Sequence, residues 1–308
     1  MNGLLNVSSN PHIRSNITTS SIMLLVVISL LPAAGFGVFH FGLNALLLLF
    51  VSIIGCVLFE FLFNLLCKRK TTIGDLSAVV TGLLLGMNLP PRAPWWIALV
   101  GSFFAIVIVK MLFGGIGQNF MNPALGARCF LMISFTSIMT NFNIDSYTGP
   151  TPLRIMKDGG TVDIIDMLKG YTAGTIGETS AIALLIGAAF LVVCGVIDLV
   201  IPATYLFSFA IFMGLMGGHG FDVTYICAQL VGGGLILGAF FMATDYVTRP
   251  VTYKGQFIYG IILGFLTCIL RVFSPMAEGV SYAIIISNLL VPLIDKFTKP
   301  SFFGKGAA

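Results

Sequence analysis

The chain has 308 residues, of which 57% are hydrophobic and 9% are charged, and its mean hydropathy is +1.01. Because an ordinary soluble domain carries roughly 25% charged residues, this composition excludes a soluble globular protein and predicts an all-α polytopic membrane protein. The net charge of +4 comes from basic residues scattered between long apolar runs, which excludes a disordered chain and a nucleic-acid-binding protein.

Ten apolar segments of membrane-spanning character follow one another along the chain. Because each crossing needs about 20 residues, they leave no room for a large domain outside the membrane. The predicted spans are 21–40, 43–66, 74–89, 94–113, 122–139, 180–199, 201–217, 222–243, 255–273 and 280–295. The residues before the first span contain no apolar core followed by a small-residue cleavage site, so we expect no removable signal peptide.

The distribution of Lys and Arg predicts the orientation of these spans. A cytoplasmic N-terminus places ten basic residues on the cytoplasmic side and five outside, with Arg128 unassigned near a span start. Both termini are then cytoplasmic. The chain divides into an N-terminal segment 1–20, a first half 21–139, an extracytoplasmic loop 140–179, a second half 180–295 and a cytoplasmic tail 296–308.

Two halves of five spans each would be inverted relative to one another in the membrane. Such inverted repeats form ligand sites where broken helices meet at the interface between the repeats. The third and eighth spans both end in small or polar residues, at Gly86–Pro91 and Ala239–Asp245, which supports the repeat. Chance similarity between two apolar runs is the alternative.

The loop 140–179 is the only long connection, and it holds five of the twelve acidic residues. Connections of this length in an otherwise economical chain are usually functional or disordered. Its segment Asp145–Leu153 is rich in residues that favour turns. We therefore expect an exposed hydroxyl on a tight turn, which a modifying enzyme could reach.

Several charged residues lie within or beside the spans, where an unpaired charge is costly and a functional role is the default hypothesis. The alternative is that those near span ends extend their charged groups to the membrane surface. These residues are Glu60, Lys110, Arg128, Asp198, Asp222, Asp245 and Arg271. Glu60, Asp198 and Asp222 are candidates for an ion path by position alone.

The segment Gly114–Arg128 interrupts the apolar pattern with glycines, amides, a proline and an arginine. Irregular backbone at membrane depth is tolerated only where protein covers it or where a cavity or ligand satisfies it. A helix that opens at Pro123, with Arg128 nearby, would suit an anionic or hydrogen-bonding ligand. The alternative is a close helix–helix contact made by small residues.

Motifs for soluble cofactors and metals are absent from the sequence. There is neither a GxGxxG motif after a strand nor a GxxxxGK motif, so we expect no nucleotide site of the Rossmann or P-loop kind. The three histidines are dispersed and the six cysteines lack CxxC spacing, so we expect no metal site, no haem and no disulfide.

Four longer motifs carry a resemblance to a known family. They are Pro11–Arg14 followed by Thr18 and Thr19, Gly117–Leu125, Phe241–Asp245, and Glu278–Asn288 followed by Pro292–Asp295. With them, the chain resembles the RnfD family of membrane subunits of the Rnf ion-translocating electron-transport complex. It is more distantly similar to the NqrB subunit of the sodium-pumping NADH:quinone reductase. The match runs along nearly the whole chain.

The resemblance implies a covalently attached flavin. In that family, flavin mononucleotide (FMN) is joined through its phosphate to the last Thr of a D-x-x-[ST]-G-A-T pattern. The matching residues here are Asp145, Thr148, Gly149 and Thr151, and Pro150 stands where the pattern has Ala. Thr151 is therefore the expected attachment residue, biased to an extended conformation because Pro152 follows it. Arg154 and Lys157 are candidate partners of the phosphate.

The resemblance also implies a second, non-covalent flavin, either riboflavin or another flavin, within the membrane part. Its expected contacts are Asn122, Arg128 and Asp245. These three residues lie in the two interrupted segments described above. No residue of this chain is expected to be catalytic by itself.

By analogy with the family, electrons pass between reduced ferredoxin and NAD at cytoplasmic subunits and cross membrane iron–sulfur and flavin centres, which drives Na+ or H+ outward. The chain would carry electrons in the plasma membrane of a bacterium or archaeon. Its partners would be the other Rnf subunits (A, B, C, E and G), a flavin-transferring enzyme and membrane lipid. Two alternatives remain open: a secondary transporter or channel without a covalent cofactor, and a scaffold that has lost its flavin.

Overall fold

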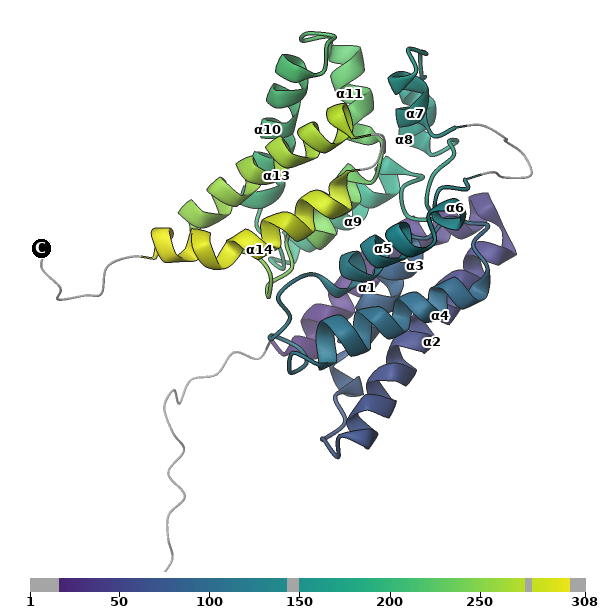
Figure 1. Cartoon of the computed structure of the whole chain (residues 1–308), viewed down its shortest axis with the longest axis vertical. Coiled ribbons are helices and arrows are strands. Elements are labelled where there is room, and N and C mark those ends of the chain that lie inside the picture. Colours follow the sequence, from purple (N-terminus) through teal and green to yellow (C-terminus); the bar gives the residue numbers. More distant parts are fainter. Residues whose placement is uncertain (1–16, 143–149, 275–278, 300–308) are drawn as a thin grey trace, which may run out of the picture.

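The computed structural model describes residues 17–142, 150–274 and 279–299, and all regular structure within these residues is helical. In Figure 1, helices α1 to α6 of the first half gather on one side, and helices α10, α11, α13 and α14 of the second half gather on the other. This agrees with the predicted all-α fold class.

The first half begins with two long helices, α1 (Thr19–Phe41) and α2 (Leu43–Leu66). Thr18 caps the start of α1 through a reciprocal contact with Ser21, and Gly42 adopts a φ of 79° between the two helices. The remaining elements of this half are η1 (Ile73–Asp75), α3 (Ser77–Met87), α4 (Trp95–Phe103), the π-helix η2 (Phe104–Met111), α5 (Pro123–Ser134) and α6 (Thr136–Met139).

The connection and the second half contain both short and long helices. The connection holds α7 (Pro152–Lys157) and α8 (Ile164–Lys169). The second half consists of α9 (Ala181–Val193), α10 (Val200–Met216), α11 (Val223–Val231), α12 (Leu235–Leu237), the π-helix η3 (Gly238–Met242), α13 (Tyr253–Phe273) and α14 (Val280–Thr298).

Three predicted spans differ from the observed helices. Span 122–139 is divided at Phe135, and span 180–199 already ends at Val193, before Gly195 turns the backbone with a φ of 67°. Span 222–243 is broken after Val231, and its two parts are bent by 63°. Gly233 and Gly234 make this break possible because both adopt positive φ values, of 64° and 66°.

Four described helices, α1, α2, α13 and α14, are long and apolar enough to cross a membrane, and the bent pair α11 and α12–η3 is a fifth candidate. Five shorter apolar helices account for the other predicted spans. The finding agrees with a polytopic membrane protein, while the number of ten crossings stays a prediction. Large apolar side chains on the outer surface, such as Phe39, Leu66 and Val193, are at least 80% exposed, as expected for a surface in contact with lipid.

Small residues bring the long helices into close contact. In the second half, a Cβ atom on Gly260 or Gly264 of α13 would lie 1.9 Å from the Thr204 hydroxyl or 2.1 Å from the Ser208 hydroxyl of α10. In the first half, Ser102 of α4 donates a hydrogen bond to the Ser52 carbonyl of α2 at 3.1 Å. Small residues therefore lie at helix contacts in both halves.

Candidate functional site

The expected attachment residue, Thr151, lies at the start of α7. Its φ of −61° and ψ of 153° confirm the extended conformation, and its carbonyl accepts hydrogen bonds from the amides of Arg154 and Ile155. The side chain makes no capping hydrogen bond. Asp145, Thr148 and Gly149, the other residues of the attachment pattern, lie outside the described residues.

Thr151 is only 9% exposed, so the expectation of an exposed hydroxyl on a turn is wrong for this residue. The reason is tertiary: α7 is fixed against the break in the second half. A Cβ atom on Gly233 would lie 2.2 Å from Cδ1 of Leu153, and Leu153 and Met156 form an apolar cluster with Met167 of α8. Thr151 lines a pocket at this contact.

This pocket, the Thr151 pocket, is small, with a cavity volume of about 20 Å³. Its walls come from α7, the segment after α8 and the glycine break between α11 and α12. Its lining includes Thr151, Thr172, Glu178, Gly232 and Gly233.

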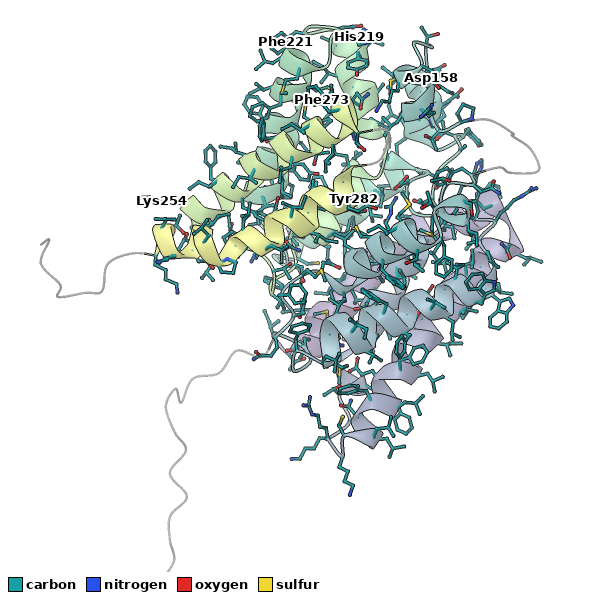
Figure 2. The ribbon with its side chains drawn as sticks, viewed as in Figure 1. Asp158, His219, Phe221, Lys254, Phe273 and Tyr282 are labelled. Carbon is teal, nitrogen blue, oxygen red and sulfur yellow. The ribbon has the colours of Figure 1, made fainter. Side chains whose placement is uncertain are left out.

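The two expected phosphate partners point elsewhere in the described structure. Arg154 forms an exposed ion pair with Asp158, with 3.1 Å between Nε and Oδ2. Lys157 donates to the carbonyls of Arg271 and Ser274 at the end of α13. Figure 2 shows Asp158 at the same end of the molecule as His219 and Phe221, far from Lys254.

A larger pocket, with a cavity volume of about 100 Å³, lies between the two halves. We call it the Asn122 pocket. Asn122 and Asp245 both line it, so the structure brings together two of the three residues expected to contact a second flavin. Arg128 is not among the lining residues. Asn119, Ser77 and Lys110 supply further polar groups, and apolar walls come from Leu84, Phe240 and Phe241 among others.

Asn122 and Asp245 are held in place by local hydrogen bonds. Asn122 caps α5, since its side-chain oxygen accepts from the Ala124 amide at 3.0 Å, and its amide group donates to the Met242 carbonyl at 3.4 Å. Asp245 follows η3 and accepts a hydrogen bond from the Thr248 hydroxyl at 3.2 Å. Apolar walls with a few convergent polar groups are typical of a small-molecule site.

Arg128 instead forms a buried ion pair with Glu178, with 3.1 Å between Nη2 and Oε1, and it also donates to the Asn88 side chain. Backbone hydrogen bonds from Ile176 to Leu89 and from Gly177 to Met87 hold the segment around Glu178 against the end of α3. Glu178 therefore joins α5 to the wall of the Thr151 pocket. The sequence did not single it out, because nothing in the local pattern separates it from the other acids of the loop.

The other charged residues of the spans fall into two groups. Glu60, Lys110 and Arg271 are at most 5% exposed, so extension to the membrane surface does not explain them. Arg271 donates to the carbonyls of Gln229, Gly232 and Gly233, where α11 ends.

The remaining two candidates for an ion path lie at exposed positions. The side chain of Asp198 is 53% exposed and lies 3.8 Å from Arg249. Asp222 caps α11 through the Thr224 amide. For Asp222, helix capping is a sufficient structural explanation.

In the part of the chain that the structure describes, no group of three or more His, Cys, Asp or Glu residues could hold a metal ion. The described cysteines are all free.

A sequence model of the NQR2, RnfD, RnfE family matches residues 6–304. The chain is 48% identical over 310 residues to the D component of the Na+-translocating ferredoxin:NAD+ oxidoreductase complex of Acetobacterium woodii. The matched region covers 97% of this chain and 95% of the relative. It is 40% identical to the D component of the proton-translocating ferredoxin:NAD+ oxidoreductase complex of Clostridium ljungdahlii, over 98% and 96% of the two chains. It is 34% identical to the D component of the ion-translocating oxidoreductase complex of Actinobacillus succinogenes, over 98% and 99%.

Proposed function

Because this chain belongs to the NQR2, RnfD, RnfE family, we propose that it is the flavin-carrying membrane subunit of an ion-translocating ferredoxin:NAD+ oxidoreductase. The observation that carries the proposal is the full-length similarity to the D components of such complexes, together with the pocket in which Thr151 lies. The chain works within a redox enzyme complex, and we expect no complete turnover from the subunit alone.

The proposed covalent cofactor is FMN on Thr151. The support from the structure is that Thr151 lines this pocket and that its side chain is not engaged in capping α7. A flavin supplies a group that accepts and donates electrons. The residues around it would fix its position and tune its potential through nearby charge.

A second, non-covalent flavin is proposed for the Asn122 pocket. The apolar walls suit a flat ring system, and Asn119, Asn122 and Asp245 offer hydrogen-bonding groups for its polar edge. Arg128 is not part of this proposed site, since it pairs with Glu178 and does not line the pocket. It remains a charge between the two proposed cofactor sites.

The proposed membrane architecture has ten spans in two inverted repeats of five. Its support comes from equivalent helix contacts: α2 packs on α4 in the first half as α10 packs on α13 in the second, and α13 packs on α14 as η2 packs on α5. We further propose a plasma-membrane location with both termini in the cytoplasm. Thr151 then faces the outside, and the Asn122 pocket opens toward the cytoplasmic side.

The proposed partners are the other Rnf subunits (A, B, C, E and G), the flavin-transferring enzyme, membrane lipid and either Na+ or H+. One relative is named for Na+ and another for protons, so the names of the relatives do not decide between these ions.

A second candidate function is a secondary transporter or channel. The specific observation in its favour is the span broken at Gly232–Gly234, with its 63° bend, because discontinuous helices form substrate sites in such proteins. This function predicts no covalent chromophore. The scaffold alternative predicts that Thr151→Ala leaves electron transfer by the complex unchanged.

In-gel fluorescence of the denatured polypeptide tests the proposal. The complex is expressed with the flavin-transferring enzyme as wild type, as Thr151→Val and as Thr172→Val, a control that removes another hydroxyl from the same pocket. We expect a fluorescent band in wild type and in the control, no band in Thr151→Val, and a mass increment on the tryptic peptide that contains Thr151. A dark wild-type band would reject covalent FMN and would direct attention to solute or ion uptake in liposomes.

A further inference from the structure

An ion pair that is almost completely shielded from solvent lies in the first half, between α2 and the π-helix η2. The Lys110 Nζ atom is 2.6 Å from Oε2 of Glu60, and the two side chains are 4% and 0% exposed. A buried ion pair is rarely retained for stability alone, because desolvation of both charges offsets much of their attraction. This pair therefore calls for a functional explanation.

The pair belongs to a longer chain of hydrogen bonds. Lys110 also donates to the Ser77 hydroxyl at 2.6 Å, and Ser77 donates to Oδ1 of Asp75 at 2.5 Å. On the other side, the Thr72 hydroxyl donates to Oε1 of Glu60. Thr72 is exposed and Asp75 is partly exposed, so the chain of hydrogen bonds reaches from the molecular surface to the buried carboxylate.

One member of the pair, Lys110, also forms part of the wall of the Asn122 pocket. Lys110 and Ser77 both line the pocket, and Glu60 lies directly behind Lys110. Lys110 is placed there by η2, in which the usual helical hydrogen-bond register is widened by one residue. Such π-helical turns frequently occur at functional sites. A group in the pocket would thus lie next to a positive charge whose partner carboxylate is hydrogen-bonded to an exposed hydroxyl.

An electron that enters a poorly solvated pocket adds a negative charge that water cannot offset there. Such a charge favours protonation of a carboxylate close by. Protonation of Glu60 would neutralise that carboxylate and leave the charge of Lys110 available to balance the added electron.

We propose that Glu60 takes up one proton for each electron that enters the Asn122 pocket. Lys110 then becomes the counter-charge of the reduced group. This inference rests on the flavin proposed for that pocket. The proton comes from the solvent at Thr72. The Thr72 hydroxyl passes its own proton to Oε1 of Glu60, where an O–H bond forms. Thr72 regains a proton from hydronium in the bulk solvent, which leaves a neutral water molecule. One electron and one proton enter, Lys110 stays an ammonium, and no further reactant is needed.

Other titratable groups around Glu60 are Lys110 on η2, Cys56 on the same helix, and Asp75 on η1, while Asp245 faces the pocket from the second half. Glu60 is favoured because it alone among the described carboxylates both pairs with a pocket-lining cation and accepts from an exposed hydroxyl. A proton also fits between the existing partners without displacing a heavy atom, whereas Na+ would need several oxygen ligands in their place.

Redox-induced infrared difference spectroscopy of the purified complex tests the proposal. In wild type we expect reduction to produce the signal of a protonated carboxyl group, and Glu60→Gln removes it. Lys110→Arg retains the signal, because Arg preserves the positive charge. The matched control is Asp222→Asn, which removes an exposed carboxylate outside the Asn122 pocket while keeping a residue that can cap α11, and it should leave the signal unchanged.

The potential of the non-covalent flavin gives a second readout. One proton taken up per electron changes the redox equilibrium constant tenfold for each pH unit, which is 59 mV. Glu60→Gln should remove the part of this dependence that Glu60 supplies. If Glu60→Gln does not assemble, Glu60→Gln/Lys110→Gln removes both charges and should lack the carboxyl signal as well.

The outcomes separate this proposal from the proposed function. If acid extraction releases no non-covalent flavin from the wild-type complex, the occupant proposed for the Asn122 pocket is wrong, and proton uptake linked to it is overturned as well. If flavin is released but the signal persists in Glu60→Gln, follows Asp245→Asn instead, or depends on Na+ rather than on pH, only the role of Glu60 is overturned.

Discussion

Arg128 on α5 and Glu178 ahead of α9 form an ion pair, 3.1 Å between Nη2 and Oε1, at the centre of a polar connection between the two pockets. Glu178 lines the Thr151 pocket, and Arg128 donates to Asn88. The Asn88 amide lies 3.9 Å from the sulfur of Met242, whose carbonyl accepts from Asn122 in the other pocket. The pair therefore links the two halves of the chain as well as the two candidate sites.

The Arg128–Glu178 pair predicts strong coupling between its members. Glu178→Ala leaves a buried guanidinium without this partner, and removal of one member of a buried pair costs about 3–5 kcal/mol. We expect thermal unfolding of the solubilised complex to shift to clearly lower temperature in Glu178→Ala. The double variant Arg128→Met/Glu178→Leu should recover a large part of that loss, whereas additive losses would show that the two side chains act independently.

The glycine break predicts a link between backbone geometry and flavin attachment. In Gly233→Ala the new Cβ atom would lie 2.2 Å from Leu153 and displace α7, so we expect in-gel flavin fluorescence at Thr151 to fall several-fold. Gly195→Ala is the control, because it has a similar φ of 67° but nothing within 4 Å of the new atom. Each substitution costs roughly 1–2 kcal/mol in backbone strain. Equal fluorescence in the two variants would mean that contact with Leu153 does not matter for attachment.

Asn122 is expected to serve both as a helix cap and as a contact in its pocket. Asn122→Ala should cost about 1 kcal/mol through loss of the cap and should also reduce the non-covalent flavin released by acid. Asp163→Ala removes the cap of α8, where Asp163 accepts from the Ile165 amide at 2.8 Å, and it does not line the Asn122 pocket. The ratio of released flavin to protein separates the two roles, and a ratio unchanged in Asn122→Ala would contradict the proposed contact.

The proposed orientation predicts which cysteines a membrane-impermeant maleimide reaches. Cys67 and Cys194 are exposed and lie at the ends of α2 and α9. Both should be labelled in inside-out vesicles and protected in right-side-out vesicles. Asp158→Cys, at an exposed position in the connection, should show the opposite pattern. Labelling of Asp158→Cys from the cytoplasmic side would place the Thr151 pocket in the cytoplasm and reject the proposed orientation.

Local patterns in the sequence determined the class of protein and most of its helices. The predicted span 43–66 coincides with α2, and 255–273 differs from α13 by two residues at its start. Continuous apolar runs and their capping residues lie close together along the chain, so the sequence alone reveals them. The same holds for the extended conformation of Thr151, which follows from the ring of Pro152.

Tertiary structure alone decided which distant residues meet. Glu60 pairs with Lys110 and Arg128 pairs with Glu178 across 50 positions of sequence, and Asn122 shares a pocket with Asp245 from the other half. Tertiary packing also buries Thr151, which the turn pattern predicted to be exposed. The physical reason is that a buried charge or amide must find a partner, and the available partner depends on which helices pack together, a choice that the apolar pattern of a single span does not encode.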